Sequence, residues 1–445
     1  MKIPHHSIIY GTLILTGVSF LCRGIGFFYR MSISQTFGEE GMGIYQLTAP
    51  VMSMAFSLSC AGFQTALSRY VAAKADNERA SLRFLLTGIV ITTAISSLLS
   101  AFIYLFSDFL AVSVLLESRT APLLRLLALA FPFSAVHCCV NGYFYGKRKA
   151  EIPALLQFVE QLARVGSVLL LCHIYESHNY EIPLALTAAG SAIAEFVSTI
   201  VSLCFIFPKI SACQTNNFGK KTLSGYQNSF LEAASCLLSM AVPLSVSRII
   251  VNLLQNVENI YIPEMLRRFG YTTAESLSLF GVLTGMALTV IFLPSSLVNS
   301  ISVQLLPRIS EAQAGSRNKE IAHVIRRCIT FCCIMGLICS TGFFLFGRWA
   351  GEFLFHSKTA GDYIVNLSFI CPFLYITSSL GSILHGLGKT YTTLFINVGT
   401  LLLRIGSVFF LIPKMGIPGY ILGLLIGQCF SALCCIFSLR KYALY

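Results

Sequence analysis

Continuous apolar segments of about twenty residues recur along the whole chain, and this feature limits its fold more than any other. A helix of about 20 apolar residues is long enough to cross the hydrocarbon core of a bilayer. A transmembrane barrel is a poor alternative, because barrel strands alternate apolar and polar residues and these segments do not. The sequence therefore predicts an all-α polytopic membrane protein of about twelve transmembrane helices, at residues 8–29, 42–66, 83–106, 121–143, 153–173, 183–207, 232–256, 277–300, 321–347, 363–386, 391–412 and 417–438.

The composition supports a membrane protein and argues against an aqueous catalytic domain. Apolar residues make up 55% of the chain and charged residues only 11%, whereas a soluble protein needs more charge on its surface. The longest polar stretch between predicted helices spans only residues 209–229, so we expect no enzymatic activity. The 16 cysteines lie mostly in apolar segments without metal or redox spacing, so neither a metal site nor a cofactor is predicted.

The basic charge of the chain follows the predicted membrane topology. The net charge is +12, which could suggest a nucleic-acid partner. However, basic groups such as residues 147–149, 220–221 and 326–327 fall on one predicted side, and the other side is richer in acidic residues. This is the positive-inside pattern. It predicts that both termini are cytoplasmic, and it removes the reason to expect nucleic-acid binding.

Short motifs recur with a shift of 240 residues, which predicts an internal repeat. The pairs are Phe131-Pro132-Phe133 with Cys371-Pro372-Phe373, Gly146-x-x-Lys149 with Gly386-x-x-Lys389, and Arg164-Val-Gly-Ser-Val168 with Arg404-Ile-Gly-Ser-Val408. Six helices in each half would enter the membrane in the same orientation, as a parallel repeat. We therefore predict an N-terminal six-helix lobe at 1–208, a cytoplasmic linker at 209–229 and a C-terminal six-helix lobe at 230–445. Two such lobes are typical of alternating access.

Polar side chains form a stripe on the first predicted helix of each half. On the first helix the stripe consists of Thr12, Thr16, Ser19, Arg23 and Arg30; on the seventh it consists of Arg248, Asn252, Gln255 and Asn259. Their helical spacing places each set on one face. Such groups can simply join helices by hydrogen bonds, but a guanidinium in a membrane needs a carboxylate or water. We predict a hydrophilic cavity between the lobes, in which arginine favours an anionic substrate.

Carboxylates within the predicted helices are candidates for ion coupling. Glu195 lies midway along its helix, and Glu258 flanks the second polar stripe, so both are candidates. Glu195 could alternatively neutralise an arginine. Glu160 is four residues before Arg164, which predicts an ion pair within one helix. His137 lies near the end of a predicted helix and is expected only to form hydrogen bonds.

The first two predicted helices resemble a known family. The segments Arg23-Gly-Ile-Gly-Phe-Phe-Tyr-Arg30, Phe37-Gly-Glu-Glu-Gly-Met-Gly-Ile-Tyr-Gln-Leu47 and Ser59-Cys-Ala-Gly-Phe-Gln-Thr-Ala-Leu-Ser68 are similar to the polysaccharide transporter branch of the MOP flippase superfamily. Within it, the chain resembles the stage V sporulation protein B and MurJ-like lipid II flippase group. The resemblance implies a MATE-like fold in a bacterial cytoplasmic membrane. It also implies that Arg23 and Arg30 line a central cavity, and that relatives with fourteen helices have two more than are expected here.

Three functions are compatible with these features. The resemblance implies a flippase for undecaprenyl-pyrophosphate-linked glycan precursors, such as lipid II, in cell-wall, spore-cortex or polysaccharide biosynthesis. Its partners would be the lipid-linked oligosaccharide, the phospholipid bilayer, and H⁺, Na⁺ or the membrane potential as the driving force. The alternative is a cation-coupled multidrug exporter of the MATE type, although the first helix has arginines and no carboxylate before Glu39. The third is a membrane scaffold for wall or spore assembly that transports nothing.

Overall fold

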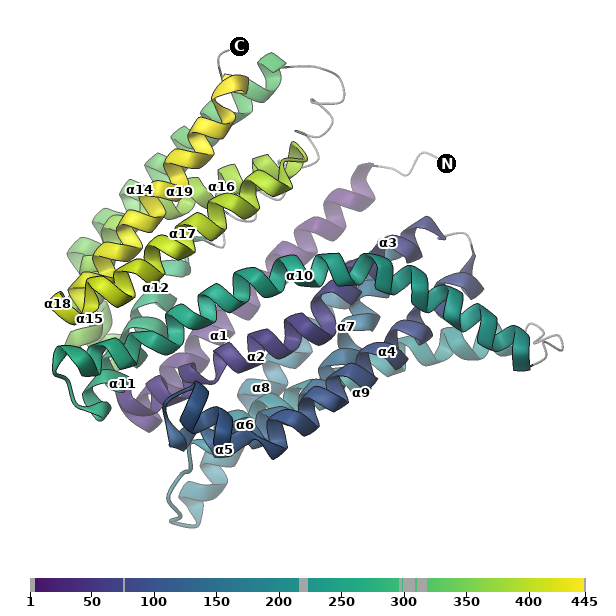
Figure 1. Cartoon of the computed structure of the whole chain (residues 1–445), viewed down its shortest axis with the longest axis horizontal. Coiled ribbons are helices and arrows are strands. Elements are labelled where there is room, and N and C mark those ends of the chain that lie inside the picture. The colour runs from purple at the N-terminus through teal and green to yellow at the C-terminus, as the bar shows by residue number, and fades with distance from the viewer. Residues whose placement is uncertain are drawn as a thin grey trace. The chain divides into compact units, whose positions relative to one another are not determined.

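The computed structural model of the protein describes residues 5–74, 77–215, 223–295, 298, 309 and 318–443, and every regular element in these ranges is a helix (Figure 1). Nine described helices are long and apolar enough to cross a membrane, or ten if a pair bent by 51° counts as one span. The two other predicted spans, 8–29 and 42–66, fall on the helix His5–Leu47 and on the three consecutive helical segments Ala49–Phe56, Ser57–Ala61 and Gly62–Ala73. The all-α polytopic fold is confirmed, and the described helices are consistent with a count of twelve.

The described contacts divide the chain into two compact units. The first unit comprises Met1–Gly26 and Thr48–Asn252. It contains the first part of α1 (His5–Leu47), then α2 (Ala49–Phe56), η1 (Ser57–Ala61), α3 (Gly62–Ala73), α4 (Glu78–Leu105), α5 (Ser107–Phe109), η2 (Leu110–Val114), η3 (Ser118–Thr120), α6 (Ala121–Ala128), α7 (Phe131–Gly146), α8 (Glu151–Ser177), α9 (Ala185–Thr215) and the first part of α10 (Leu223–Phe269). Its core includes the buried Leu85, Tyr143 and Leu237.

The second unit comprises Phe27–Leu47 and Leu253–Tyr445. After the remaining parts of α1 and α10 it contains α11 (Thr273–Gly281), η4 (Val282–Ala287), α12 (Leu288–Phe292), α14 (Asn318–Phe355), α15 (Lys358–Leu367), η5 (Ser368–Ile370), α16 (Cys371–Gly386), α17 (Thr390–Phe410), α18 (Ile412–Met415) and α19 (Ile417–Ala443). In both units many large apolar side chains are exposed, among them Leu105, Phe207, Phe410 and Phe437. Such a surface is stable in lipid but not in water.

The units do not coincide with the two halves of the sequence. Residues 27–47 group with the second unit, and residues 230–252 group with the first. Most of the predicted linker at 209–229 is helical, since α9 extends to Thr215 and α10 begins at Leu223; residues 216–222 lie outside the described ranges. The lobe boundaries therefore remain a prediction about the repeat, whereas the contacts assign parts of α1 and α10 to the opposite half.

The helices at the first two predicted spans differ in their ends from those spans. The first predicted span ends at residue 29, whereas α1 continues to Leu47, with an interruption at Gly38, where φ is 71°. The second predicted span starts at residue 42, in the part of α1 after this interruption, and α2 begins at Ala49, with Pro50 in its first turn. Hydropathy marks the membrane-crossing part of a helix, whereas its length also depends on packing and capping beyond the apolar segment.

The repeat is visible in the backbone at the shift of 240 residues. A proline starts both α7 and α16, directly after a break in the preceding helix, as expected because proline lacks the amide hydrogen that a continuing helix needs. Both helices end in the same turn, in which the amide of Lys149 donates to Phe144 O and that of Lys389 to Leu384 O, each at 2.9 Å. Arg148 and Gly388 share a left-handed conformation there.

One buried side-chain contact is also repeated, with its partners exchanged. In the first half, Thr92 Oγ1 lies 3.2 Å from Cys139 Sγ. In the second half, Cys332 Sγ donates to Ser379 Oγ at 3.2 Å. Both positions of the second pair follow those of the first by 240 residues. The two halves therefore pack equivalent helix faces, which supports the parallel repeat.

Candidate functional site

The two arginines of the first stripe lie in different units. Arg23 is exposed and has no hydrogen bond or ion pair with any residue that the structure describes. Arg30 is half-buried in the second unit, and its Nη1 donates to Thr289 Oγ1 at 2.6 Å. Of the other members, Ser19 is half-buried, and the side chains of Thr12 and Thr16 lie outside the described ones. Arg23 therefore keeps its donors free for a ligand, whereas Arg30 is partly engaged.

The stripe on α10 is also divided between anchored and free groups. Within the first unit, Asn252 Nδ2 donates to Ser57 Oγ at 2.5 Å. The exposed Arg248 makes a long bond of 3.4 Å to Thr65 Oγ1. Further along, in the second unit, Gln255 is exposed and Asn259 is half-buried. Asn252 thus joins α10 to η1, and Arg248 and Gln255 are the members most accessible to a ligand.

Two glycines of the segments that carry the family resemblance, Gly43 and Gly62, lie where two helices pack closely together. A Cβ atom on Gly43 would lie 2.0 Å from Leu277 O of α11, and one on Gly62 would lie 2.2 Å from Ser245 Oγ of α10. Neither distance allows a side chain, so only glycine lets these helices approach so closely. The glycine-rich segment at 38–43 is helical on both sides of Gly38.

Glu258 is part of a buried ion pair in the second unit. Its side chain is completely buried, and its Oε1 accepts from Arg404 Nε of α17 at 2.8 Å and from Tyr420 Oη of α19 at 2.7 Å. Arg404 has no carboxylate on its own helix, so the sequence did not indicate this partner. An arginine that already neutralises Glu258 makes this carboxylate a weaker candidate for ion coupling than Glu195.

Glu195 belongs to a second buried cluster, in the first unit. Its Oε2 lies 3.7 Å from His137 Nδ1, and Glu160 Oε2 lies 3.9 Å from the same nitrogen. Glu160 forms the expected ion pair with Arg164. The sequence did not reveal that His137 joins these groups, because they come from α7, α8 and α9 and no local spacing connects them. In the described parts of the chain, no group of three or more His, Cys, Asp and Glu residues could hold a metal ion.

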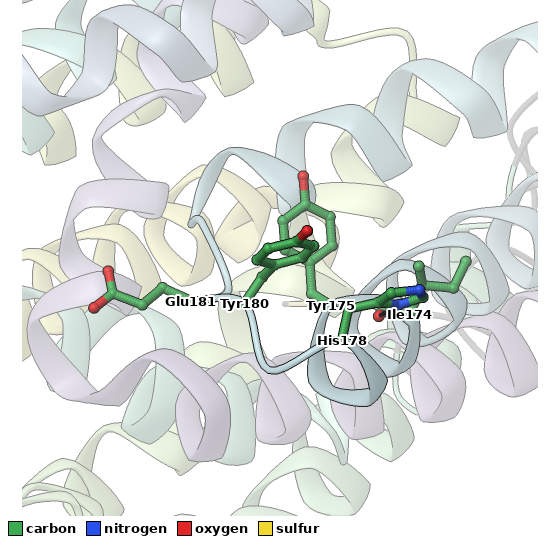
Figure 2. Close-up of a pocket in the computed structure, with 5 residues that line it drawn as sticks. All are labelled: Ile174, Tyr175, His178, Tyr180 and Glu181. Atoms are coloured by element: carbon green, nitrogen blue, oxygen red, sulfur yellow. Dashed lines mark hydrogen bonds between the residues drawn. The ribbon is translucent and has the colours of Figure 1, made fainter.

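A surface hollow of about 620 Å³ lies at the end of α8. Figure 2 shows its aromatic side chains, Tyr175, His178 and Tyr180, close together, with Glu181 extending away from them. The ring of His178 stacks on that of Tyr180, with centroids 6.1 Å apart. Tyrosines at the end of a membrane helix are typical of the membrane–water interface. We therefore assign this hollow to the interface and not to the transport site.

Most of the chain matches the model of one protein family. A family model described as "Polysaccharide biosynthesis protein" matches residues 8–313. The chain belongs to this family. The chain is 27% identical to stage V sporulation protein B of Bacillus subtilis (strain 168), over 94% of this chain and 80% of that protein. It is 20% identical to the lipid II flippase MurJ of the same organism, over 98% of this chain and 83% of that protein.

Solved structures show the same fold at low sequence identity. A multidrug resistance MATE family transporter of the MOP superfamily, in an inward-facing conformation, matches with a TM-score of 0.72 and 14% identity, over 97% of each chain. Lipid II flippase MurJ, in an inward closed conformation, matches with a TM-score of 0.70 and 15% identity, over 97% of this chain and 90% of that one. The family match therefore places the chain among the polysaccharide biosynthesis proteins, and the solved structures show that it has the fold of the MATE transporter and of MurJ.

Proposed function

We propose that this protein flips undecaprenyl-pyrophosphate-linked glycan precursors, lipid II or a related saccharide unit, across the bacterial cytoplasmic membrane. The observation that carries the proposal is the exposed guanidinium of Arg23 in a long apolar helix, which has no hydrogen bond or ion pair with any described residue. A guanidinium held in such a helix needs an anion or water. Its planar donors match the oxygens of a pyrophosphate. Two relatives carry names that refer to sporulation and to lipid II.

Arg248 extends the same chemistry to the first helix of the second half. It is exposed, and its hydrogen bond to Thr65 Oγ1 is long, at 3.4 Å. We assign phosphate binding to Arg23 and Arg248, with Arg30 as an additional donor. Gln255 and Asn259 are suited to sugar hydroxyls, since amides both donate and accept. Both termini would face the cytoplasm, and a cation or the membrane potential would drive the cycle without a chemical step.

Complementation of a strain depleted of its lipid II flippase tests this function. We expect the wild-type chain to restore growth and Arg23→Ala to abolish or strongly reduce it. One charge-assisted bond to phosphate contributes about 1.5–3 kcal/mol, so its loss weakens binding roughly ten- to hundredfold. Arg348→Ala is the matched control, because Arg348 is also exposed but pairs with Asp362 at 2.9 Å. This variant should complement as well as wild type, at equal membrane abundance.

Other results would favour the competing functions. A cation-coupled multidrug exporter is favoured by the buried carboxylates Glu160 and Glu195 and by the fold similarity to MATE transporters. Resistance to cationic dyes, combined with no complementation, would support that alternative. Full complementation by the Arg23→Ala, Arg248→Ala double variant would show that the two arginines do not hold the headgroup.

A further inference from the structure

The cluster around His137 brings three titratable groups together from three helices of the first unit. His137 lies on α7 and is only 8% exposed. Its Nδ1 lies 3.9 Å from Glu160 Oε2 on α8 and 3.7 Å from Glu195 Oε2 on α9. The carboxylate side chains are 17% and 18% exposed. One ring nitrogen therefore faces two largely buried carboxylates.

Hydrogen bonds around the ring indicate where its proton lies. His137 Nε2 is 2.8 Å from Asn141 Nδ2. In this orientation the amide donates, so the neutral imidazole carries its hydrogen on Nδ1, toward the carboxylates. Glu195 Oε2 and Asn141 Oδ1 are buried, and neither has a hydrogen-bond partner in the described structure. Rotation of the amide would let Oδ1 accept from a protonated Nε2, so the same residues can also hold an imidazolium.

The charges of the cluster do not balance without one more proton. Arg164 neutralises Glu160 through their ion pair within α8, which leaves Glu195 with a neutral histidine. The thiol of Cys22 on α1 interacts electrostatically with Glu160 and that of Cys138 on α7 with Glu195, and neither thiol supplies a positive charge. A buried, uncompensated carboxylate is costly. One proton, shared by Glu195 and His137, removes that cost.

The equivalent place in the second half has no such excess. Gly190 of α9 packs against Ser167, and Gly423 of α19 packs against Ser407 of the repeated motif, which aligns the last helices of the two halves. The residues at equivalent positions in the second half are uncharged: Thr377 for His137, Thr400 for Glu160 and Gln428 for Glu195. Arg404 is instead neutralised by Glu258. The surplus of titratable groups is therefore specific to the first half.

We propose that His137, Glu160 and Glu195 form a proton-binding site in the first unit, and that its occupancy drives the transport cycle. The second part of this inference rests on the proposed function. On loading, Glu195 Oε2 takes a proton from water and an O–H bond forms; on release, that bond breaks and the proton returns to water. The three groups come from α7, α8 and α9, so loading or emptying the site changes the electrostatic force between these helices. In this way the charge of one proton can alter the packing of three helices.

Infrared difference spectroscopy of the full chain in phosphatidylcholine vesicles tests the site without any substrate. We expect the wild-type protein to show a protonated-carboxyl C=O band that titrates with pH. The isosteric Glu195→Gln should lose this band, and His137→Gln should move its midpoint. Asp362→Asn, which removes an exposed carboxylate in the second unit, is the control and should leave the band unchanged.

Two results would overturn the proposal. One is a titrating band that is identical in wild type, Glu195→Gln and Glu160→Gln. The other is a band that responds at fixed pH to NaCl but not to choline chloride, because the site would then hold sodium. Complementation is scored separately: a titrating site in a chain that does not complement would contradict the proposed substrate and leave the proton site intact.

Discussion

Arg404 and Glu258 form a largely buried ion pair in the second unit. The carboxylate is fully buried, and the guanidinium side chain is 18% exposed. Such a pair adds little to stability compared with apolar residues of the same size, because both charges lose their hydration. Removing one partner is different, since the other then remains charged and buried.

We therefore predict that Glu258→Gln lowers the free energy of unfolding by about 3–5 kcal/mol. Thermal unfolding in detergent, followed by circular dichroism, measures the loss. Asp362→Asn breaks the exposed pair with Arg348, whose side chains are 79% and 53% exposed, and should cost less than about 1 kcal/mol. If the two variants melt alike, the buried pair does not hold α10 and α17 together. Adding Arg404→Met to Glu258→Gln should recover part of the loss.

At the scale of the helices, glycines allow α1 and α11 to approach each other closely. Gly43 on α1 and Gly281 on α11 lie against each other's helices, and a Cβ on Gly281 would lie 2.4 Å from Glu39 O. Nearby, Glu39 accepts hydrogen bonds from Ser278 at 2.7 Å and from Ser357 at 2.5 Å. These contacts join the C-terminal part of α1 to α11 and to the start of α15 within the second unit.

Replacing Gly43 should disrupt this crossing. The new methyl group of Gly43→Ala would lie 2.0 Å from Leu277 O, which forces α1 and α11 apart. We expect a loss of at least about 1–3 kcal/mol in stability, the range of overpacked cores. Gly17→Ala on the same helix is the matched control, since no atom lies within 4 Å of its Cβ position. Equal detergent melting temperatures for the two variants would contradict the close contact.

For the molecule as a whole, the important feature is that each compact unit contains a segment from the other half of the sequence. The second unit includes residues 27–47, and the first includes residues up to Asn252 of α10. Neither half of the chain therefore contains all the contacts of one unit. When one half of the chain is present alone, its unit lacks the helix segment that the other half supplies. The buried face on which that segment packs is then exposed.

We predict that a chain divided between Thr215 and Leu223 works only as two co-expressed fragments. Each fragment alone should be degraded or aggregate, and together they should copurify in detergent. Gly43→Val in the first fragment should reduce copurification, because that glycine packs on α11 of the second; Gly17→Val should not. A second fragment that is stable by itself would show that it does not need residues 27–47.

The sequence by itself determined the membrane-spanning helices, the parallel repeat and the family. It also predicted the Glu160–Arg164 pair. The spans and the ion pair depend on residues close together along the chain, and the repeat depends on a fixed shift between its two copies. Only the tertiary structure showed that Arg404 meets Glu258, that His137 faces Glu195, and that α1 and α10 contribute to both units. Hydropathy and spacing describe one helix at a time, whereas the partner of a buried charge depends on which helix faces pack together.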